Sequence, residues 1–388
     1  MNYFLTEEQE MLQELCAQIA REKIIPVRAE YDESGEFPWD IVKVMAESDI
    51  YGVYIPEEYG GFGGGITEMC IATEELSKAC GGIALAFAAS ALGTMPILLF
   101  GSEEQKKEYL PPIAAGEKLA AFALTEANAG SDAGAVETRA ELDGDEYVLN
   151  GTKQWITNGG EAEVYTVVAR TKKGAGIRGI SAFIVDKDTP GFTFGKKEDK
   201  MGIRASATRE LVFQDCRVPK KNLIGREGMG FMVAMRTFDQ SRPGVAAQAV
   251  GIAQGAFEEA ARYARQREQF GQPVASFQGV KFMLADMATQ IEAARALVLS
   301  VARAVDAGEK SVAKLSGMAK LFASDVAMKV TTDAVQILGG YGYMKEYPVE
   351  KMMRDAKITQ IYEGTNQIQR EVIGSAVIKE SAAADRGK

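Results

Sequence analysis

A carboxylate near the C-terminus stands beside a flexible turn, an arrangement suited to a general base next to a bound ligand. Glu363 is followed by Gly364 and Thr365, with helical patterns before and after, and a glycine at a chain reversal lets the backbone approach a ligand. Ile361 and Tyr362 precede it, and partial desolvation raises the pKa of a glutamate above its usual value of about 4.3. We predict that Glu363 accepts a proton near neutral pH. For an arbitrary Tyr-Glu-Gly the commoner arrangement is a solvated loop glutamate.

The chain of 388 residues contains no histidine, which removes the commonest general base and the commonest metal ligand. Its cysteines, Cys16, Cys70, Cys80 and Cys216, lack the C-x-x-C spacing and favour reduced, packed thiols over a disulfide framework or a zinc site. We expect no metal site, and catalysis then depends on carboxylates, hydroxyls or a cofactor.

The formal net charge of the chain is -10 at pH 7. A nucleic-acid backbone is bound by clustered Lys and Arg side chains, so this acidic balance disfavours a nucleic-acid partner. Hydrophobic residues make up 46% of the chain and charged residues 25%, which is ordinary for a soluble globular protein. The length predicts two or three domains.

An uncharged stretch from Ala79 to Ser102 is long enough to raise the question of a membrane span. Glycines, hydroxyl side chains and Pro96 interrupt it, so we predict two buried helical pieces joined near Thr94 and Pro96, and no membrane span. The first residues are acidic and lead into a helical pattern, unlike a signal or transit peptide. We therefore expect a cytoplasmic protein.

Hydrophobic periodicity divides the chain into three regions. Helical spacing dominates residues 1–118, short strand candidates separated by Gly and Pro fill residues 119–228, and helical spacing returns over residues 229–388. The strand candidates end near Leu142 or cover residues 147–149, 164–169, 180–185 and 192–194, with a hairpin signal at Asp143-Gly144. We predict an α+β chain with an N-terminal α-helical domain, a middle β domain and a C-terminal four-helix bundle.

The glycine-rich segment at residues 55–65 lacks the G-x-x-x-x-G-K-[ST] order of a phosphate-binding loop, and no strand clearly leads into it. We interpret it as a structural turn.

The segment from Phe122 to Gly134 combines small residues with hydroxyl groups. Thr125, Gly130 and Ser131 let the backbone approach a planar or phosphorylated ligand and offer it hydrogen-bond donors. In isolation, a Gly/Ser loop at the start of a β domain accounts for the same residues.

Trp155 and Thr157 alternate on one face of a predicted strand. An aromatic ring and a hydroxyl in this register can pack against a flat ring and hydrogen-bond its edge. Without further context, a buried structural tryptophan explains Trp155 equally well.

Two further sets of residues could bind a ligand. Asp239 and Arg242 are three residues apart and share one helix face, although a surface ion pair has the same spacing. Arg267 offers a guanidinium for phosphate, Phe270 an apolar face, and Gly339-Gly340 a close backbone approach. A solvated helix end and a plain glycine helix break are the alternatives for these last two segments.

Taken together, these segments resemble the acyl-CoA dehydrogenase family. Ile361 to Thr365, with Gln367 to Arg370 behind it, is similar to the catalytic-base motif, and the other segments follow in family order along nearly the whole chain. The resemblance implies an FAD enzyme in which Glu363 removes the α-proton of an acyl-CoA thioester and the β-hydrogen leaves as hydride to flavin N5. It further implies that the Glu363 backbone N–H and a ribityl hydroxyl of FAD hold the thioester oxygen.

The resemblance also implies roles for individual residues, with Glu363 as the catalytic residue. The implied FAD-binding residues are Phe122, Leu124, Thr125, Gly130, Ser131, Trp155, Thr157, Arg267, Gln269, Phe270, Gln336, Gly339, Gly340, Thr365 and Gln367. The implied substrate-binding residues are Ser131, Asp239, Arg242, Tyr362 and Gly364. In relatives, the segments matching residues 265–271 and 336–342 hold the FAD of a neighbouring subunit, so the complete site would need more than one chain.

The partners implied by the resemblance are an acyl-CoA substrate, an electron-transfer flavoprotein and identical subunits in a homotetramer, a dimer of dimers. The implied metabolic setting is fatty acid β-oxidation. An enoyl-CoA reductase running the reverse reaction and a non-catalytic flavoprotein, including the DNA-associated relatives, are the alternatives. An oxidase is disfavoured because family oxidases usually have longer chains.

The acyl group is only partly defined by the sequence. The expected pocket wall, Ala79 to Ser102, has no Arg or Lys, which disfavours a dicarboxylic substrate. Gly93 to Pro96 and Phe238 to Pro243 look most like medium-chain members, whereas Met353 to Lys357 is common to short-chain and medium-chain relatives. Straight, branched and alicyclic acyl groups are not ranked.

Overall fold

The computed structural model describes residues 3–309 and 312–386. Its first part is helical, as predicted, and begins at a capping box in which the side chains of Thr6 and Gln9 each accept a hydrogen bond from the other's backbone amide. The helices of this part are α1 (Glu7–Ile19), α2 (Arg28–Ser34), α3 (Trp39–Glu47), α4 (Ile66–Ala79), α5 (Gly81–Phe100) and α6 (Glu103–Ala114).

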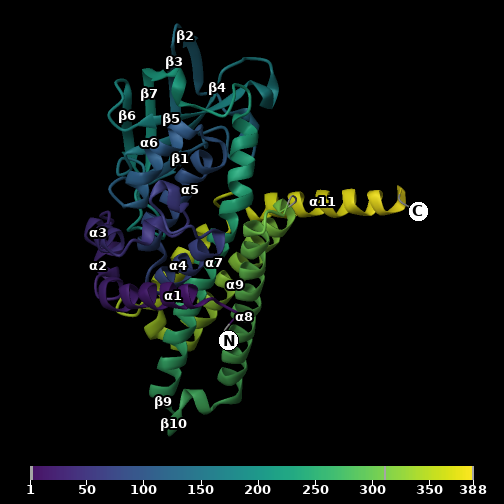
Figure 1. Cartoon of the computed structure of the whole chain (residues 1–388). Coiled ribbons are helices and arrows are strands. Elements are labelled where there is room, and N and C mark those ends of the chain that lie inside the picture. The colour runs from purple at the N-terminus through teal and green to yellow at the C-terminus, as the bar shows by residue number, and fades with distance from the viewer. Residues whose placement is uncertain (1–2, 310–311, 387–388) are drawn as a thin grey trace.

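The middle of the chain forms a sheet at one end of the molecule (Figure 1). Its strands are β1 (Ala120–Ala123), β2 (Arg139–Asp143), β3 (Glu146–Thr157), β4 (Val164–Arg170), β5 (Ile180–Asp186), β6 (Phe192–Lys197), β7 (Thr208–Pro219) and β8 (Leu223–Ile224). Their order is β6-β7-β3-β2-β4-β5-β8, with β1 parallel to β4. The predicted hairpin is confirmed, since Asp143 pairs with Glu146 and Gly144 has a φ of 62°.

Strand β7 is the main strand that the sequence analysis missed. It pairs with β3 and β6 and contributes buried side chains such as Leu211, Phe213 and Cys216. Charged and polar side chains alternate with these buried ones, so the segment lacks the run of β-branched residues that marked the other strands.

The last part of the chain is helical again and consists of α7 (Gly230–Gln266), α8 (Gln278–Asp306), α9 (Ala313–Leu338), α10 (Val349–Ile358) and α11 (Asn366–Arg386). Helices α7, α8 and α9 pack side by side, α4 joins them, and α10 and α11 pack on α9. Helix α7 runs from the sheet towards the opposite end, where the short strands β9 (Glu268–Gln269) and β10 (Gln272–Pro273) form a hairpin (Figure 1). The predicted division at residues 118 and 228 falls between α6 and β1 and between β8 and α7, and as a division into domains it stays a prediction.

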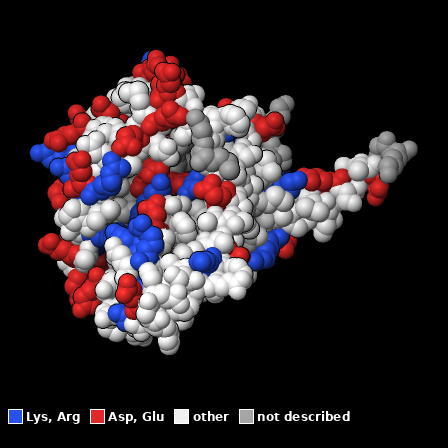
Figure 2. Space-filling model, turned by 90° about the horizontal axis from the view of Figure 1, so that it is seen from below, with Lys and Arg blue, Asp and Glu red and all other residues white. Residues whose placement is uncertain are grey.

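Helix α11 extends away from the body of the molecule as an arm, and the C-terminus lies near its tip (Figure 1). The same arm is visible from below in Figure 2, where acidic and basic side chains are interspersed over the face of the body. The arm carries exposed apolar side chains, Val377 and Ile378.

The uncharged stretch forms one continuous helix, α5, so the prediction of two pieces joined near Thr94 and Pro96 is wrong. The helix passes through Pro96, which removes the helical hydrogen bond to Leu92 O. Around it, the Thr94 hydroxyl donates to Ser90 O at 2.7 Å, and the Thr166 hydroxyl of β4 donates to Gly93 O at 3.1 Å and so joins the helix to the sheet. Among the described helices, α5 is the one with the length and apolarity of a membrane span, and 72% of its most apolar window is buried inside the protein. It is a core helix, and a cytoplasmic location stays a prediction.

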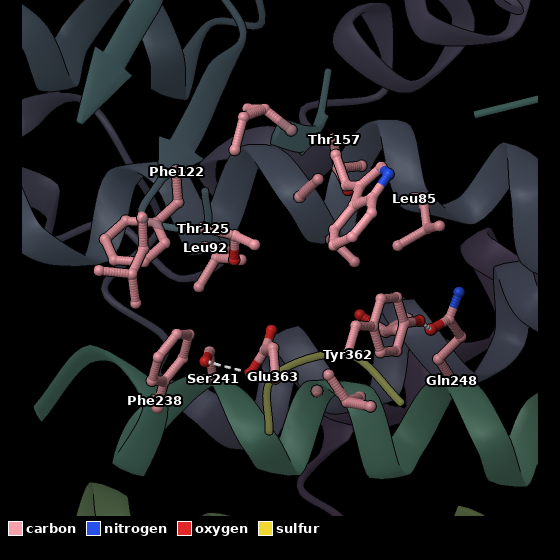
Figure 3. Close-up of a pocket in the computed structure, with 18 of the residues that line it drawn as sticks. Leu85, Leu92, Phe122, Thr125, Thr157, Phe238, Ser241, Gln248, Tyr362 and Glu363 are labelled. Atoms are coloured by element: carbon pink, nitrogen blue, oxygen red, sulfur yellow. Dashed lines mark hydrogen bonds between the residues drawn. The ribbon is translucent and has the colours of Figure 1, made fainter. Parts of the chain in front are cut away.

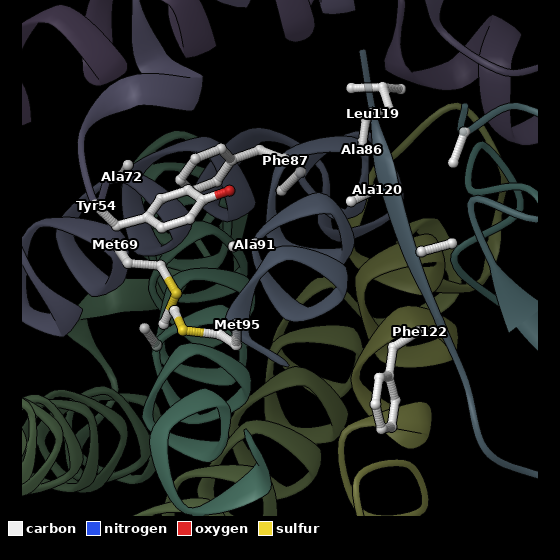
Figure 4. Close-up of a cluster of buried hydrophobic side chains, with 14 of the residues drawn as sticks. Tyr54, Met69, Ala72, Ala86, Phe87, Ala91, Met95, Leu119, Ala120 and Phe122 are labelled. Atoms are coloured by element: carbon white, nitrogen blue, oxygen red, sulfur yellow. The ribbon is translucent and has the colours of Figure 1, made fainter. Parts of the chain in front are cut away.

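The core around α5 is filled by side chains from distant parts of the chain (Figure 4). Phe87 packs edge-on against Tyr51 and Tyr54, with ring centroids 5.9 and 6.0 Å apart. The glycine-rich segment beside it is a structural turn, as predicted: a Cβ on Gly61 would lie 2.0 Å from Ile55 O.

Helix α5 and strand β1 approach so closely that position 93 requires a glycine. A Cβ at Gly93 would lie 2.5 Å from the backbone nitrogen of Ala121. We expect Gly93→Ala to destabilise the protein by about 1–3 kcal/mol in thermal unfolding, because neither backbone can move away cheaply. In the matched control, Gly279→Ala in α8, the added Cβ meets nothing within 4 Å, and the change should stabilise by up to about 1 kcal/mol. Equal effects of the two substitutions would contradict this packing.

Candidate active site

Glu363 lies in the turn between α10 and α11, and its carboxylate points into a cavity (Figure 3). Both Glu363 and Gly364 have left-handed backbone conformations, with φ of 51° and 89°. Such a conformation is costly for a residue with a side chain. The turn therefore aims the carboxylate at the cavity at an energetic cost that surrounding contacts must offset.

The cavity lies between the sheet and the helices and opens to solvent, and about 870 Å³ of the space within it and at its mouth is free of protein atoms. Its lining residues are Met69 and Thr73 of α4, Leu85, Ala88, Ala89 and Leu92 of α5, Phe122, Leu124 and Thr125 at β1, Trp155, Ile156 and Thr157 of β3, Phe238, Ser241, Gly244, Val245 and Gln248 of α7, and Tyr362 and Glu363. In Figure 3, Glu363 and Ser241 face Thr125 and Leu92 across the space. The expected pocket wall is thus confirmed as part of the lining, and no Lys or Arg lies among these residues.

The position of Glu363 makes its carboxyl a weaker acid than an ordinary glutamate. Burial raises the pKa of Glu363 to about 7, although a hydrogen bond from the Ser241 hydroxyl and the charges of Arg242 and Lys320 act to lower it. The Ser241 hydroxyl donates to Oε2 at 2.6 Å, and the other oxygen, Oε1, has no hydrogen-bond partner among the described residues. The carboxylate can therefore take a proton at Oε1 near neutral pH.

Of the two residues predicted to shield the Glu363 carboxyl from water, Tyr362 and Ile361, only Tyr362 lines the cavity. Tyr362 lines the cavity, as expected, and donates its hydroxyl to Gln248 Oε1. Ile361 is 47% exposed and faces away from the cavity lining. The apolar cavity walls, more than the residues preceding Glu363 in sequence, keep water from its carboxyl.

Five predicted cofactor residues line the cavity on the side formed by β1 and β3, namely Phe122, Leu124, Thr125, Trp155 and Thr157. Trp155 is 54% exposed, with a φ of 58° at an irregularity in the pairing of β3 with β7, so it is not the buried structural tryptophan considered above. The side-chain hydroxyls of Thr125 and Thr157 line the cavity and make no hydrogen bond among the described residues. An exposed ring beside free hydroxyls suits a flat heterocycle with polar edges.

A buried ion pair fixes this wall. Lys153, which is fully buried, donates to Glu126 Oε1 at 2.6 Å and to Leu124 O at 2.9 Å. Burial lowers the pKa of Lys153 to about 8. Burial also acts to raise the pKa of Glu126, but the Lys153 ammonium and the donors around it hold that pKa below its ordinary value. Together with the bond from Gln154 N to Thr125 O at 2.8 Å, the pair attaches Thr125 to β3.

The chain matches the acyl-CoA dehydrogenase N-terminal domain over residues 6–117, the middle domain over residues 121–216 and the C-terminal domain over residues 228–378. The chain belongs to the acyl-CoA dehydrogenase family. It is an oxidoreductase with the fold of that family, so the predicted order of helical, β and helical parts is confirmed.

Two curated relatives are similar over nearly their whole length. The short-chain specific acyl-CoA dehydrogenase of Clostridium acetobutylicum is 50% identical over 381 residues, 98% of this chain and 100% of that protein. The acryloyl-CoA reductase (NADH) of Anaerotignum propionicum is 51% identical over 381 residues, 98% of this chain and 96% of that protein. Similarity of this level favours the short-chain side of the predicted resemblance.

Three solved structures superpose closely. Butyryl-CoA dehydrogenase of Megasphaera elsdenii has a TM-score of 0.95 at 49% identity, covering 97% of this chain and 100% of that one. A chain from work on the electron transferring flavoprotein of Acidaminococcus fermentans and flavin-based electron bifurcation has a TM-score of 0.95 at 52% identity, covering 97% and 99%. The acyl-CoA dehydrogenase of Bacillus anthracis complexed with FAD has a TM-score of 0.92 at 37% identity, covering 99% and 70%. Family members thus bind FAD.

Asp239 and Arg242 form a buried pair in the enzyme, not the surface ion pair considered above. Arg242 Nη1 lies 3.9 Å from Asp239 Oδ1, and both residues are less than one tenth exposed. Burial raises the pKa of Asp239, against the charges of Arg242 and Arg236. Arg242 Nε also donates to Glu363 O at 3.2 Å, so this arginine contacts the turn that carries the carboxylate. A direct role of the pair in substrate binding stays a prediction.

The remaining predicted cofactor residues lie elsewhere. Arg267, Gln269, Gly339 and Gly340 come together in a second pocket with Tyr341, near the β9–β10 hairpin at the opposite end of the helices from the sheet (Figure 1). Phe270 beside this pocket is 93% exposed, and Gln336 is exposed. The predicted FAD-binding residues thus occupy two separate places in one chain.

A last group of predicted residues does not line the Glu363 cavity. Gly130, Ser131 and Gln367 are exposed outside it. The Thr365 hydroxyl accepts a hydrogen bond from the amide of Ile368 at 3.3 Å, at the start of α11. Their roles toward FAD and substrate stay predictions.

Sequence reasoning missed Ser241, Gln248 and Lys320 as site residues. Ser241, Gly244, Val245 and Gln248 follow helical spacing on one face of α7, so a helical projection that starts from Ser241 would have grouped them. Nothing in the sequence around Lys320 marks it as a residue of the site.

The Lys153 pair gives a stability prediction. Lys153→Met leaves the Glu126 carboxylate buried without its cation, and we expect a loss of about 3–5 kcal/mol in the free energy of unfolding. The measurement is urea unfolding of the purified protein, with Lys173→Met as the control because Lys173 is exposed in a turn; that change should stay within about 0.5 kcal/mol. A loss no larger than the control's would show that the pair does not hold this wall.

Proposed function

We propose that this enzyme catalyses the FAD-dependent α,β-dehydrogenation of a short, non-dicarboxylic acyl-CoA to a 2-enoyl-CoA. The observation that carries the proposal is the Glu363 carboxylate, whose pKa is raised to about 7 and which faces Thr125 and Thr157 across a cavity that Trp155 also lines. A base on one side of an acyl chain and a hydride acceptor on the other is the arrangement that this reaction requires.

The residues present fit FAD. The free hydroxyls of Thr125 and Thr157 and the exposed Trp155 ring offer hydrogen bonds to the edge of a flat heterocycle and a surface for it to lie on. When bound there, FAD supplies the acceptor for the β-hydride of the substrate.

Glu363 acts as the base. Its Oε1 takes the α-proton of the thioester, while the Ser241 hydroxyl holds Oε2 at 2.6 Å and so fixes the rotation of the carboxylate. The cavity walls exclude water, which keeps the base weakly solvated and ready for proton transfer. The hydrogen bond from the Tyr362 hydroxyl to Gln248 Oε1 holds the residue that precedes Glu363 against α7.

The backbone N–H of Glu363 is a candidate donor to the thioester oxygen. Among the hydrogen bonds of the described residues it has no acceptor. A free donor beside the base can stabilise the negative charge that develops on this oxygen as the proton leaves. Glu363 would then both accept the α-proton, through its carboxylate, and stabilise the charge on the thioester oxygen, through its backbone N–H.

The dimensions and chemistry of the cavity support a short, uncharged acyl group. Gln248 lies two helical turns beyond Ser241, which corresponds to about 10 Å along α7, and it bridges the Tyr362 hydroxyl and Gly81 O. This bridge ties three elements together at that end of the cavity. The absence of Lys and Arg from the lining gives a second carboxylate no partner.

We further propose that the electrons pass to an electron-transfer flavoprotein and that the enzyme is a homotetramer. The 52% identity with a chain from the Acidaminococcus fermentans work supports the first. The separation of the predicted FAD residues into two pockets supports a site shared between subunits. The similarity to the acryloyl-CoA reductase favours enoyl-CoA reduction by the same residues as the second candidate function.

The first test of the proposal is anaerobic reduction of the purified yellow protein. Adding butyryl-CoA should bleach the flavin absorbance, and Glu363→Gln should slow bleaching by about 10⁴-fold or more while FAD stays bound, because the variant has no base. Glutaryl-CoA should leave the spectrum unchanged. Bleaching by NADH that crotonyl-CoA then reverses, without bleaching by butyryl-CoA, would favour the reductase, and no response to any acyl-CoA would refute both functions.

The second test concerns chain length. Gln248→Ala should open the end of the cavity, and the kcat/KM of hexanoyl-CoA relative to butyryl-CoA should rise about tenfold, since each buried methylene contributes about 0.8 kcal/mol. Gln266→Ala, at the exposed end of the same helix, is the control and should leave the ratio unchanged. An active Gln248→Ala variant with the original ratio would mean that Gln248 does not limit the acyl group.

A further inference from the structure

Lys320 is a buried cation that lies against the Glu363 turn. Its side chain, on α9, is fully buried and donates to Gly364 O at 2.9 Å and to Asn366 Oδ1 at 2.9 Å. Among the described residues it has no carboxylate within 4.0 Å. Lysines are almost never fully buried without an ion-pair partner, so this position requires a physical explanation.

The carbonyl groups of the turn are held from three helices. Glu363 O accepts from Arg242 Nε of α7 at 3.2 Å and from Gln369 Nε2 of α11 at 3.1 Å. Gly364 O accepts from Gln369 Nε2 at 2.9 Å and from Lys320 of α9. These bonds fix both peptide planes of a turn whose left-handed backbone would otherwise be unfavourable at Glu363. The aim of the carboxylate thus depends on side chains that do not touch the cavity.

The charged groups around Lys320 indicate that its positive charge acts mainly on the Glu363 carboxylate. Arg242 faces it from α7 and is paired with Asp239, while Asp325 of its own helix already accepts from Gln360, Asn366 and Arg370. Burial acts to lower the pKa of Lys320, and the Glu363 carboxylate is the largest influence that opposes this change and favours the charged lysine. In return, the charges of Arg242 and Lys320 lower the pKa of Glu363 against the effect of burial. Tyr362, the remaining titratable group of the turn, donates to neutral Gln248.

We propose that Lys320 is a positioning residue for Glu363, which fixes the turn through the Gly364 carbonyl and keeps the base ionised through its positive charge. The inference rests on the proposed function, since it concerns the same base. A neutral donor could hold Gly364 O equally well. The charge is therefore the part of Lys320 that acts on proton transfer.

The sign of the expected effect follows from this charge. Glu363 accepts the α-proton only in its ionised form, so the rate of flavin bleaching rises with pH through the pKa of Glu363. Removing a nearby positive charge raises the pKa of a carboxyl group. The acid limb of the pH profile should therefore move to higher pH when Lys320 loses its charge.

The experiment compares Lys320→Gln, which keeps a hydrogen-bond donor without the charge, with Lys320→Met, which keeps neither and provides a second charge-free variant if the first does not fold. Lys329→Gln is the matched control, because Lys329 lies on the same helix, is half exposed and pairs with Asp333. Each protein is measured by the pH dependence of anaerobic bleaching with butyryl-CoA. The apoproteins are also titrated by infrared difference spectroscopy against their Glu363→Gln counterparts, which reports the protonated carboxyl of Glu363 without any turnover.

The expected result is an upward shift of about one pH unit in both the bleaching profile and the infrared midpoint of each Lys320 variant, and no shift in Lys329→Gln. Lys320→Met should also lose maximal rate at high pH, because the turn is held by one bond fewer. A lower maximal rate with an unmoved midpoint would overturn the inference, as that is what a purely structural lysine gives. If no acyl-CoA bleaches the wild-type protein, the proposed function fails, and the infrared midpoints still decide the role of Lys320.

Discussion

The structure depends on a balance at the Glu363 carboxyl. An apolar cavity removes water from it and raises its pKa to about 7, while the Ser241 hydroxyl and the charges of Arg242 and Lys320 favour the ionised form. Less burial would leave a glutamate too weakly basic to remove a proton from carbon, and less compensation would leave it protonated. The surrounding helices supply both the apolar walls and the compensating donors.

Helix α7 carries much of this balance. One face contributes Ser241, Gly244, Val245 and Gln248 to the cavity, and Arg242 projects to the turn behind it. A Cβ at Gly244 would lie 2.9 Å from Met69 Cε, so the glycine leaves room for the Met69 side chain of α4 in the cavity lining. Helix α7 thus lines one side of the cavity and also places a positive charge, that of Arg242, near the Glu363 carboxylate.

The sheet provides the opposite wall and is held just as firmly. Lys153 and Glu126 are buried together and attach the Thr125 loop to β3, so the hydroxyls that suit a flavin are not carried by a loose loop. Both sides of the cavity therefore rely on a buried lysine behind the residues that face the ligand. The second pocket, with Arg267 and Gly339, lies at the other end of the helices from this cavity, and a site shared between chains stays a proposal.

The sequence by itself determined the family and the order of helical and β parts. Its short local motifs also marked Glu363, Trp155 and Thr157, which line the cavity, while their roles stay predictions. It was wrong about α5, because the helix continues through Pro96 where it is buried in the core, and the residues that pack around it lie far away in sequence. Ser241 and Lys320, which are 122 and 43 residues from Glu363, entered the site only through tertiary packing. The pKa of a carboxyl depends on everything within a few ångströms of it, and helix packing, not local sequence, decides what lies there.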